Sequence, residues 1–150
     1  MAAAQEFFTK MRMFSVRLTT GIANTDGTGS PSAVVWWSAD GTTAAGAVPS
    51  TDYMLSGFYI TSSSATGVGN PADSLIQCYA VNKATSAEVR KVTTVDIGDP
   101  PAGTTASPEL ALYVPMGPQY TFSRNTELQF SISVTPTAGN VDILGYVMAA

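Results

Sequence analysis

Short runs in which apolar and polar residues alternate most restrict how this chain can fold. Near the C-terminus, Leu128, Phe130 and Ile132 alternate with polar residues. Because neighbouring side chains of a strand point to opposite faces, this pattern predicts a β-strand with one buried face, and we expect Phe130 and Ile132 to point inward. An apolar run over 141–148 predicts a second closing strand, and alternation also occurs at about 13–20. The chain is therefore expected to form sheets.

Segments rich in Gly, Pro, Asn, Asp and Ser separate these runs, which is typical of turns between short strands. The other expected strands are AVVWWS, YMLSGFYI, SLIQCYAV, EVRKVTTVDI, LALYV and QYTFS. Eight or nine short strands with turn signals every 8–12 residues predict an antiparallel β-sandwich, jelly-roll-like in its connections. A chain of 150 residues fits one such domain, which we assign to residues 13–150.

The N-terminal segment, residues 1–17, reads as an arm or first helix that precedes the sandwich. Its apolar stripe at helical spacing comprises Phe7, Phe8, Met11 and Phe14, and its positive charges are Lys10, Arg12 and Arg17. Such a stripe can lie in a groove of a partner, with the charges favouring an acidic surface. Alternatively, the stripe closes one open end of the sandwich itself.

Two expected strands, YMLSGFYI and SLIQCYAV, carry apolar residues on both faces. The first is predicted to have Met54, Ser56, Phe58 and Ile60 on one face and Leu55, Gly57 and Tyr59 on the other. By the same alternation, Trp36 and Trp37 cannot both enter one core, so one of them should lie on an outer face or interface. Apolar patches beyond the needs of a core usually mark contacts between subunits, so we expect a closed homo-oligomer, a trimer. Ser131 points to the face opposite Phe130, and Ser131→Ala should cost little if that face meets solvent.

The composition excludes most enzymatic chemistry. The chain has no histidine, and Cys78 is its single cysteine, so Ser-His-Asp sites, Cys-His sites and thiolate metal clusters are ruled out. Most carboxylates lie in turn contexts such as TDG, ADG and GDP, where Asp serves backbone hydrogen bonding. We therefore assign no catalytic, cofactor-binding or metal-binding residue and expect no enzyme. A net charge of −4 argues against nucleic-acid binding, and no apolar stretch is long enough to span a membrane.

The Ala-rich start MAAAQEFF, the long Ser/Thr/Gly/Ala loops, the absence of histidine and the closing pair LQFSISVTPTAGNVDILGYVMAA make the chain resemble small structural proteins of bacteriophage virions. Head decoration (cement) proteins and the heads of short fibres are similar in being compact β-sandwiches, often trimeric. The resemblance implies a homo-oligomeric decoration protein that stabilises the shell, with the major capsid protein or another virion protein as partner. Its location would be the virion, assembled in the host cytoplasm, and the resemblance implies no catalytic residues.

The candidate partner-binding residues are Phe7, Phe8, Lys10, Met11, Arg12, Trp36 and Trp37. The alternative function is a carbohydrate- or receptor-binding module of a tail or head fibre, because exposed aromatic rings on a sandwich can stack on sugars. The aromatic residues considered for such a platform are Trp36 or Trp37 with Tyr53, Tyr59, Tyr113 and Tyr120.

Overall fold

A computed structural model of the chain describes residues 11–18, 31–37, 48–62, 75–82, 89–96, 111–132 and 141–150. This part of the chain forms ten β-strands and no helix, so the all-β prediction is confirmed. The strands are β1 (Met11–Leu18), β2 (Ser32–Ala33), β3 (Val35–Trp36), β4 (Tyr53–Ser62), β5 (Leu75–Asn82), β6 (Val89–Asp96), β7 (Ala111–Pro115), β8 (Thr121–Phe122), β9 (Thr126–Ile132) and β10 (Val141–Ala149).

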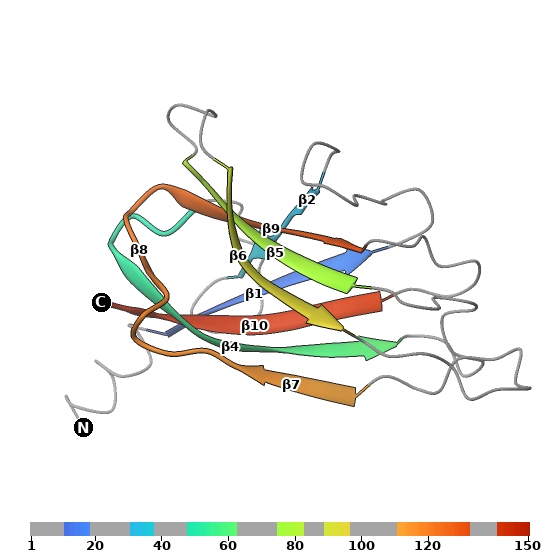
Figure 1. Cartoon of the computed structure of the whole chain (residues 1–150). Coiled ribbons are helices and arrows are strands. Elements are labelled where there is room, and N and C mark those ends of the chain that lie inside the picture. The colour runs from blue at the N-terminus through green and yellow to red at the C-terminus, as the bar shows by residue number, and fades with distance from the viewer. Residues whose placement is uncertain are drawn as a thin grey trace, which may run out of the picture.

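The strands form two antiparallel sheets that pack face to face (Figure 1). Sheet A has the order β3-β1-β10-β4-β7, and β8 also pairs with β4; sheet B has the order β2-β9-β5-β6. The predicted antiparallel β-sandwich is therefore confirmed. Jelly-roll connectivity stays a prediction.

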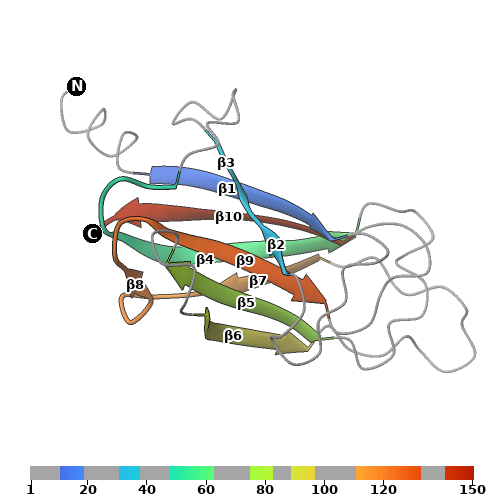
Figure 2. The ribbon, with the colours of Figure 1, turned by 90° about the horizontal axis from the view of Figure 1, so that it is seen from above.

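One chain segment passes from sheet B to sheet A. Ala33 pairs with β9 in sheet B, whereas Val35 pairs with β1 in sheet A. Between them Val34 is buried, and its amide donates a hydrogen bond to the Leu128 carbonyl at 3.1 Å. Figure 2 shows β2 continuing into β3 across this side of the sandwich. The sequence predicted one strand here, and its division into two raises the count above the eight or nine expected.

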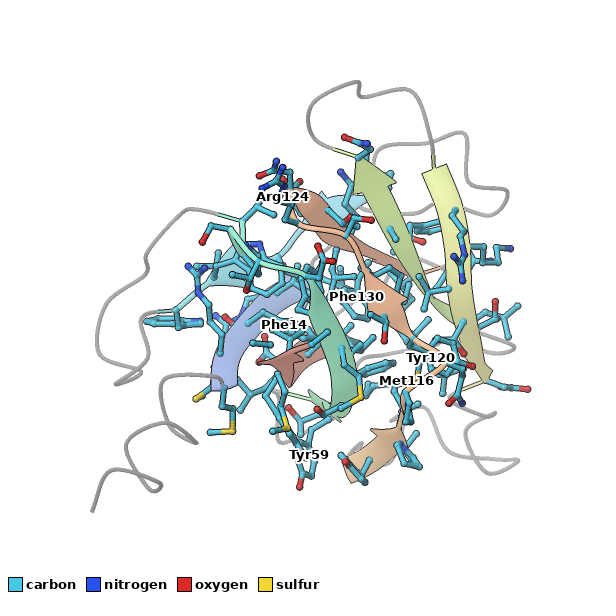
Figure 3. All side chains as sticks on the ribbon, turned by 90° about the vertical axis from the view of Figure 1, so that its left-hand side faces the viewer. Phe14, Tyr59, Met116, Tyr120, Arg124 and Phe130 are labelled. Carbon is cyan, nitrogen blue, oxygen red and sulfur yellow. The ribbon has the colours of Figure 1, made fainter. Side chains whose placement is uncertain are left out.

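The core is a cluster of aromatic and aliphatic side chains between the sheets. The Phe14 ring meets Trp36 edge to face, with centroids 5.7 Å apart, and stacks on Phe130 at 6.0 Å. Phe58 meets Phe130 edge to face at 5.2 Å. Figure 3 shows Phe14 and Phe130 pointing toward each other between the sheets. Phe130 and Ile132 are fully buried, which confirms the inward face predicted for this strand.

The faces predicted for β4 are wrong in one half of the strand. Leu55 and Gly57 pair with consecutive residues of β10, so Ser56 between them is an extra, bulged residue. A bulge shifts the alternation by one position, and the two halves of the strand then follow different phases. Leu55 is therefore buried together with Phe58, whereas the sequence had placed Leu55 on the face of Tyr59.

The residues of the predicted N-terminal stripe also do not share one face in the structure. The first strand begins at Met11, two residues before the expected start, so Met11 and Arg12 belong to β1. Residues three apart in a strand point to opposite faces, so Phe14 enters the core while Met11 lies on the outer side. The expected helical stripe is thus wrong for Met11 and Phe14. Phe7, Phe8 and Lys10 lie outside the described residues.

Candidate interface on the outer face of sheet A

The tryptophans predicted to contact a partner take different positions. Trp36 is 2% exposed and belongs to the core, where the Arg12 guanidinium lies 5.7 Å above its ring. Arg12 Nε donates to the Trp37 carbonyl oxygen at 3.1 Å, and burial lowers the pKa of Arg12. The Trp37 indole Nε1 donates to Ser15 Oγ at 2.8 Å and lies half-buried on the outer side of sheet A. One tryptophan in the core and one outside is what the alternation predicted.

The side of sheet A turned away from sheet B gathers apolar and aromatic side chains, and we call it the outer apolar face. It comprises Met11, Met13, Val35, Trp37, Met54, Tyr59, Tyr113, Leu144, Tyr146 and Met148, with Ser15 and Thr61 among them. Its most exposed large side chains are Val35 (42%), Leu144 (44%), Tyr113 (45%) and Tyr59 (48%). In Figure 3, Tyr59 points away from the core, on the far side of sheet A.

Three tyrosines form a cluster on this face. The rings of Tyr59 and Tyr113 are neighbours, with centroids 4.7 Å apart and an interplanar angle of 38°. A hydrogen bond between the Tyr113 and Tyr146 side chains raises the pKa of Tyr113, with desolvation and the other tyrosines as smaller causes. A Cβ at Gly57 would lie 2.6 Å from the Tyr113 hydroxyl oxygen, so Gly57 lets this ring lie close to the sheet.

Charge is nearly absent from the outer apolar face. Among the described residues that point outward from sheet A, only Arg17 and Asp142 are charged, and they pair with each other across β1 and β10. Arg17 Nε donates to Asp142 Oδ1 at 2.8 Å, and this bond raises the pKa of Arg17. The face is therefore neutral, apolar and rich in Tyr and Met, a composition typical of protein–protein contacts.

The outer side of sheet B differs. Gln77 and Tyr79 of β5 are both buried there, and the Tyr79 hydroxyl donates to Gln77 Oε1 at 2.7 Å. Ser131 pairs directly with Gln77 and is fully buried, its hydroxyl 3.4 Å from the same oxygen. Ser131 therefore does not meet solvent, although it points to the face of β9 opposite Phe130. The polar groups at the centre of this side are thus buried and bonded to one another rather than exposed.

The described residues contain neither a cluster of metal ligands nor an exposed thiol. Among them, no three His, Cys, Asp or Glu side chains come together as metal ligands, and no helix could cross a membrane. Cys78 is buried in the core, and burial raises the pKa of its thiol, so it stays protonated at neutral pH and is a poor nucleophile.

The aromatic platform considered for sugar binding is not assembled as a whole. Trp36 and Tyr53 meet edge to face inside the core, with centroids 5.7 Å apart. Trp37 lies at the β3 edge of sheet A and Tyr113 at the β7 edge, with three strands between them. Only Tyr59 and Tyr113 are exposed side by side.

Sequence reasoning missed the residues at the centre of the outer apolar face. Leu144 and Tyr146 lie on β10 between the buried residues Ile143, Gly145 and Val147. The signal was present, because the run 141–148 is apolar at nearly every position and so carries apolar residues on both faces.

No protein-family model matches the chain, and none of the curated proteins compared with it matches its sequence.

Proposed function

We propose that this chain is a non-enzymatic structural protein of a phage virion, a homo-oligomeric decoration protein that binds and stabilises the shell. The outer apolar face is the observation that carries the proposal. A solvated surface of this size and composition favours association, because covering it with protein removes apolar area from water. Each Å² of apolar area that is buried stabilises the contact by about 25 cal/mol. The resemblance to virion proteins suggests that the protein covering this face belongs to a virion.

The partners in this proposal are further copies of the chain and the major capsid protein or another virion protein. Electron cryo-microscopy of the parent particle tests it, with and without the purified protein added to undecorated shells. We expect extra density on the shell surface with the size of a 15.6 kDa β-sandwich at regular positions. Shells that gain no such density, under conditions in which the protein is folded, would refute the decoration role.

The N-terminal segment supplies the attachment in this proposal, and a deletion tests it separately. Because β1 begins at Met11, the deletion should end at Lys10 so that the sheet stays complete. An anchoring arm predicts an unchanged melting temperature and lost attachment to shells. A segment that closes the sandwich predicts a lowered melting temperature instead.

The second candidate function is a carbohydrate- or receptor-binding module of a fibre. The exposed pair Tyr59–Tyr113 favours it, since adjacent rings can stack on a sugar. The outward-pointing described residues around the pair offer few polar groups to orient a ligand, which makes this function the weaker candidate. Titration with a glycan panel tests it: binding that Tyr113→Ala abolishes would support this candidate, and binding to no glycan would refute it.

A further inference from the structure

We infer that the outer apolar face binds the same face of a second copy of this chain, so that the basic unit of the assembly is a two-fold pair of sandwiches. The inference deepens the proposed function, on which it rests for taking the chain to work in an assembly. A face that pairs with itself closes at two copies, so the pair replaces the trimer expected from the sequence.

The size of the face suits such a contact. The central strand β10 has 9 residues, and at about 3.3 Å per residue it is roughly 30 Å long. Sheet A has five strands side by side, and at about 4.8 Å per strand they span roughly 24 Å. Because the edge strands β3 and β7 have only 2 and 5 residues, the face covers about 540 Å². Two such faces in contact would bury about 1,100 Å², just above the roughly 1,000 Å² that a specific interface needs.

One row of residues crosses the whole face and is complementary to itself. In register order across the five strands, the row is Val35, Ser15, Leu144, Tyr59 and Tyr113. The two tyrosines are the large side chains at one end. At the other end, Ser15 is small and lines a shallow hollow together with Val35, Leu144 and the ion pair Arg17–Asp142.

A two-fold axis along the strands through Leu144 reverses this row in the second copy. Tyr113 of one copy then lies over Val35 of the other, and Tyr59 lies over Ser15, so that large side chains meet the hollow. Leu144 meets its own counterpart at the axis. Large side chains would thereby face smaller ones across the axis, which is the shape complementarity that a packed interface needs.

Charge presents no obstacle to this pairing. Arg17 and Asp142 neutralise each other within one chain, with Nε 2.8 Å from Oδ1, so the contact would bury no single unpaired charge. The outer side of sheet B is the worse alternative, because its polar groups Gln77, Tyr79 and Ser131 are already buried and bonded to each other.

Cross-linking through Leu144→Cys gives the sharpest test. Cys78 is buried, so the introduced thiol would be the accessible one among the described residues. Facing sheets lie about 10 Å apart, whereas a disulfide needs Cα atoms within about 7 Å, so a short bis-maleimide is the suitable reagent. We expect Leu144→Cys to be converted to a covalent dimer at micromolar concentration. The matched control is Thr94→Cys, at an exposed position of β6 that pairs with Gln77 on sheet B, and it should stay monomeric on denaturing gels.

Light scattering with a charged variant completes the test. The wild-type chain should show twice its mass of 15.6 kDa, and Leu144→Lys, which sets two like charges at the axis, should show a twofold lower mass with an unchanged far-UV spectrum. Thr94→Lys should keep the dimer mass. A wild-type monomer, or equal cross-linking of both cysteine variants, would overturn the inference.

The outcomes also separate this inference from the proposed function. If Leu144→Lys keeps the wild-type mass but no longer attaches to shells, the outer apolar face contacts the shell, and the inference fails while the decoration role stands. If the chain dimerises through Leu144 but adds nothing to shells, the decoration role fails and the inference stands. Binding of a glycan that competes with cross-linking would overturn the inference in favour of a ligand site.

Discussion

Truncation of Phe130 to alanine tests the packing of the two sheets most directly. The Phe130 ring is fully buried on β9 of sheet B and touches rings from two strands of sheet A (Figure 3). It stacks on Phe14 of β1 at an interplanar angle of 24° and meets Phe58 of β4 at 76°. The alanine variant therefore leaves a cavity between the sheets, where β1, β4 and β9 are packed together.

The expected loss follows from this geometry. Replacing a fully buried Phe by Ala usually costs about 3–5 kcal/mol, and the two ring pairs, at about 0.5–1.5 kcal/mol each, put Phe130 near the upper end of that range. A domain typically has about 5–15 kcal/mol of stability in total, so Phe130→Ala should leave a folded but marginal protein. For a domain of this length, the melting temperature should fall by on the order of 10 °C.

Urea unfolding followed by tryptophan fluorescence measures this loss, because Trp36 lies in the same aromatic cluster. Gln129→Ala is the matched control: its side chain points to the other face of β9 and is partly exposed, so it should cost less than about 1 kcal/mol. Ser131→Ala should cost about 1 kcal/mol, the usual net worth of a buried hydrogen bond. Equal losses for Phe130→Ala and Gln129→Ala would refute the register of β9 and the core built on it.

The remaining predictions concern Gly145, Gly57 and the single cysteine. Gly145→Ala should cost roughly 1–3 kcal/mol, because its Cβ would overlap the Phe14 ring and lie 2.8 Å from the Gly57 carbonyl oxygen. In the same thermal melts Gly57→Ala should cost less, since it meets the exposed Tyr113 side chain, which can move; equal losses would contradict this. Cys78 should resist a maleimide reagent in the native protein and react fully in urea, and rapid native labelling would show that its burial is wrong. Because burial raises the folded-state pKa of Cys78 above the usual thiol value of 9.0, its contribution to stability should be complete below about pH 9. It should be lost progressively as the pH rises further, which urea titrations at rising pH measure.

The strands were predictable because their signal is local. Alternation and turn residues placed the closing strand, and with it the burial of Phe130, from the sequence alone. The bulge at Ser56 was not predictable, since a bulge is a mismatch between two strands and β10 lies more than 70 residues further along the chain. The burial of Ser131 likewise depends on Gln77, a residue of another strand.

The candidate site was less predictable than the fold. The prediction of partner-binding residues favoured the aromatic dipeptide Trp36-Trp37. It therefore included Trp36, whose side chain is buried in the core. Leu144 was not predicted to bind a partner, because a leucine in a strongly apolar strand is expected to be buried until the sheet order is known. Sheet order shows that β10 is central in sheet A, and Leu144 on its outer side is exposed.

The row of residues at the centre of the proposed contact, from Val35 to Tyr113, exists only in the completed sheet. Its residues come from five strands, and Ser15 and Leu144, which are neighbours in register, are separated by most of the chain. A partly folded chain cannot present the row, so folding of sheet A must precede pairing. Among the described residues, the large exposed apolar side chains gather on sheet A. A face that binds its own copy closes at two subunits, so the proposed contact would give pairs rather than open chains of subunits.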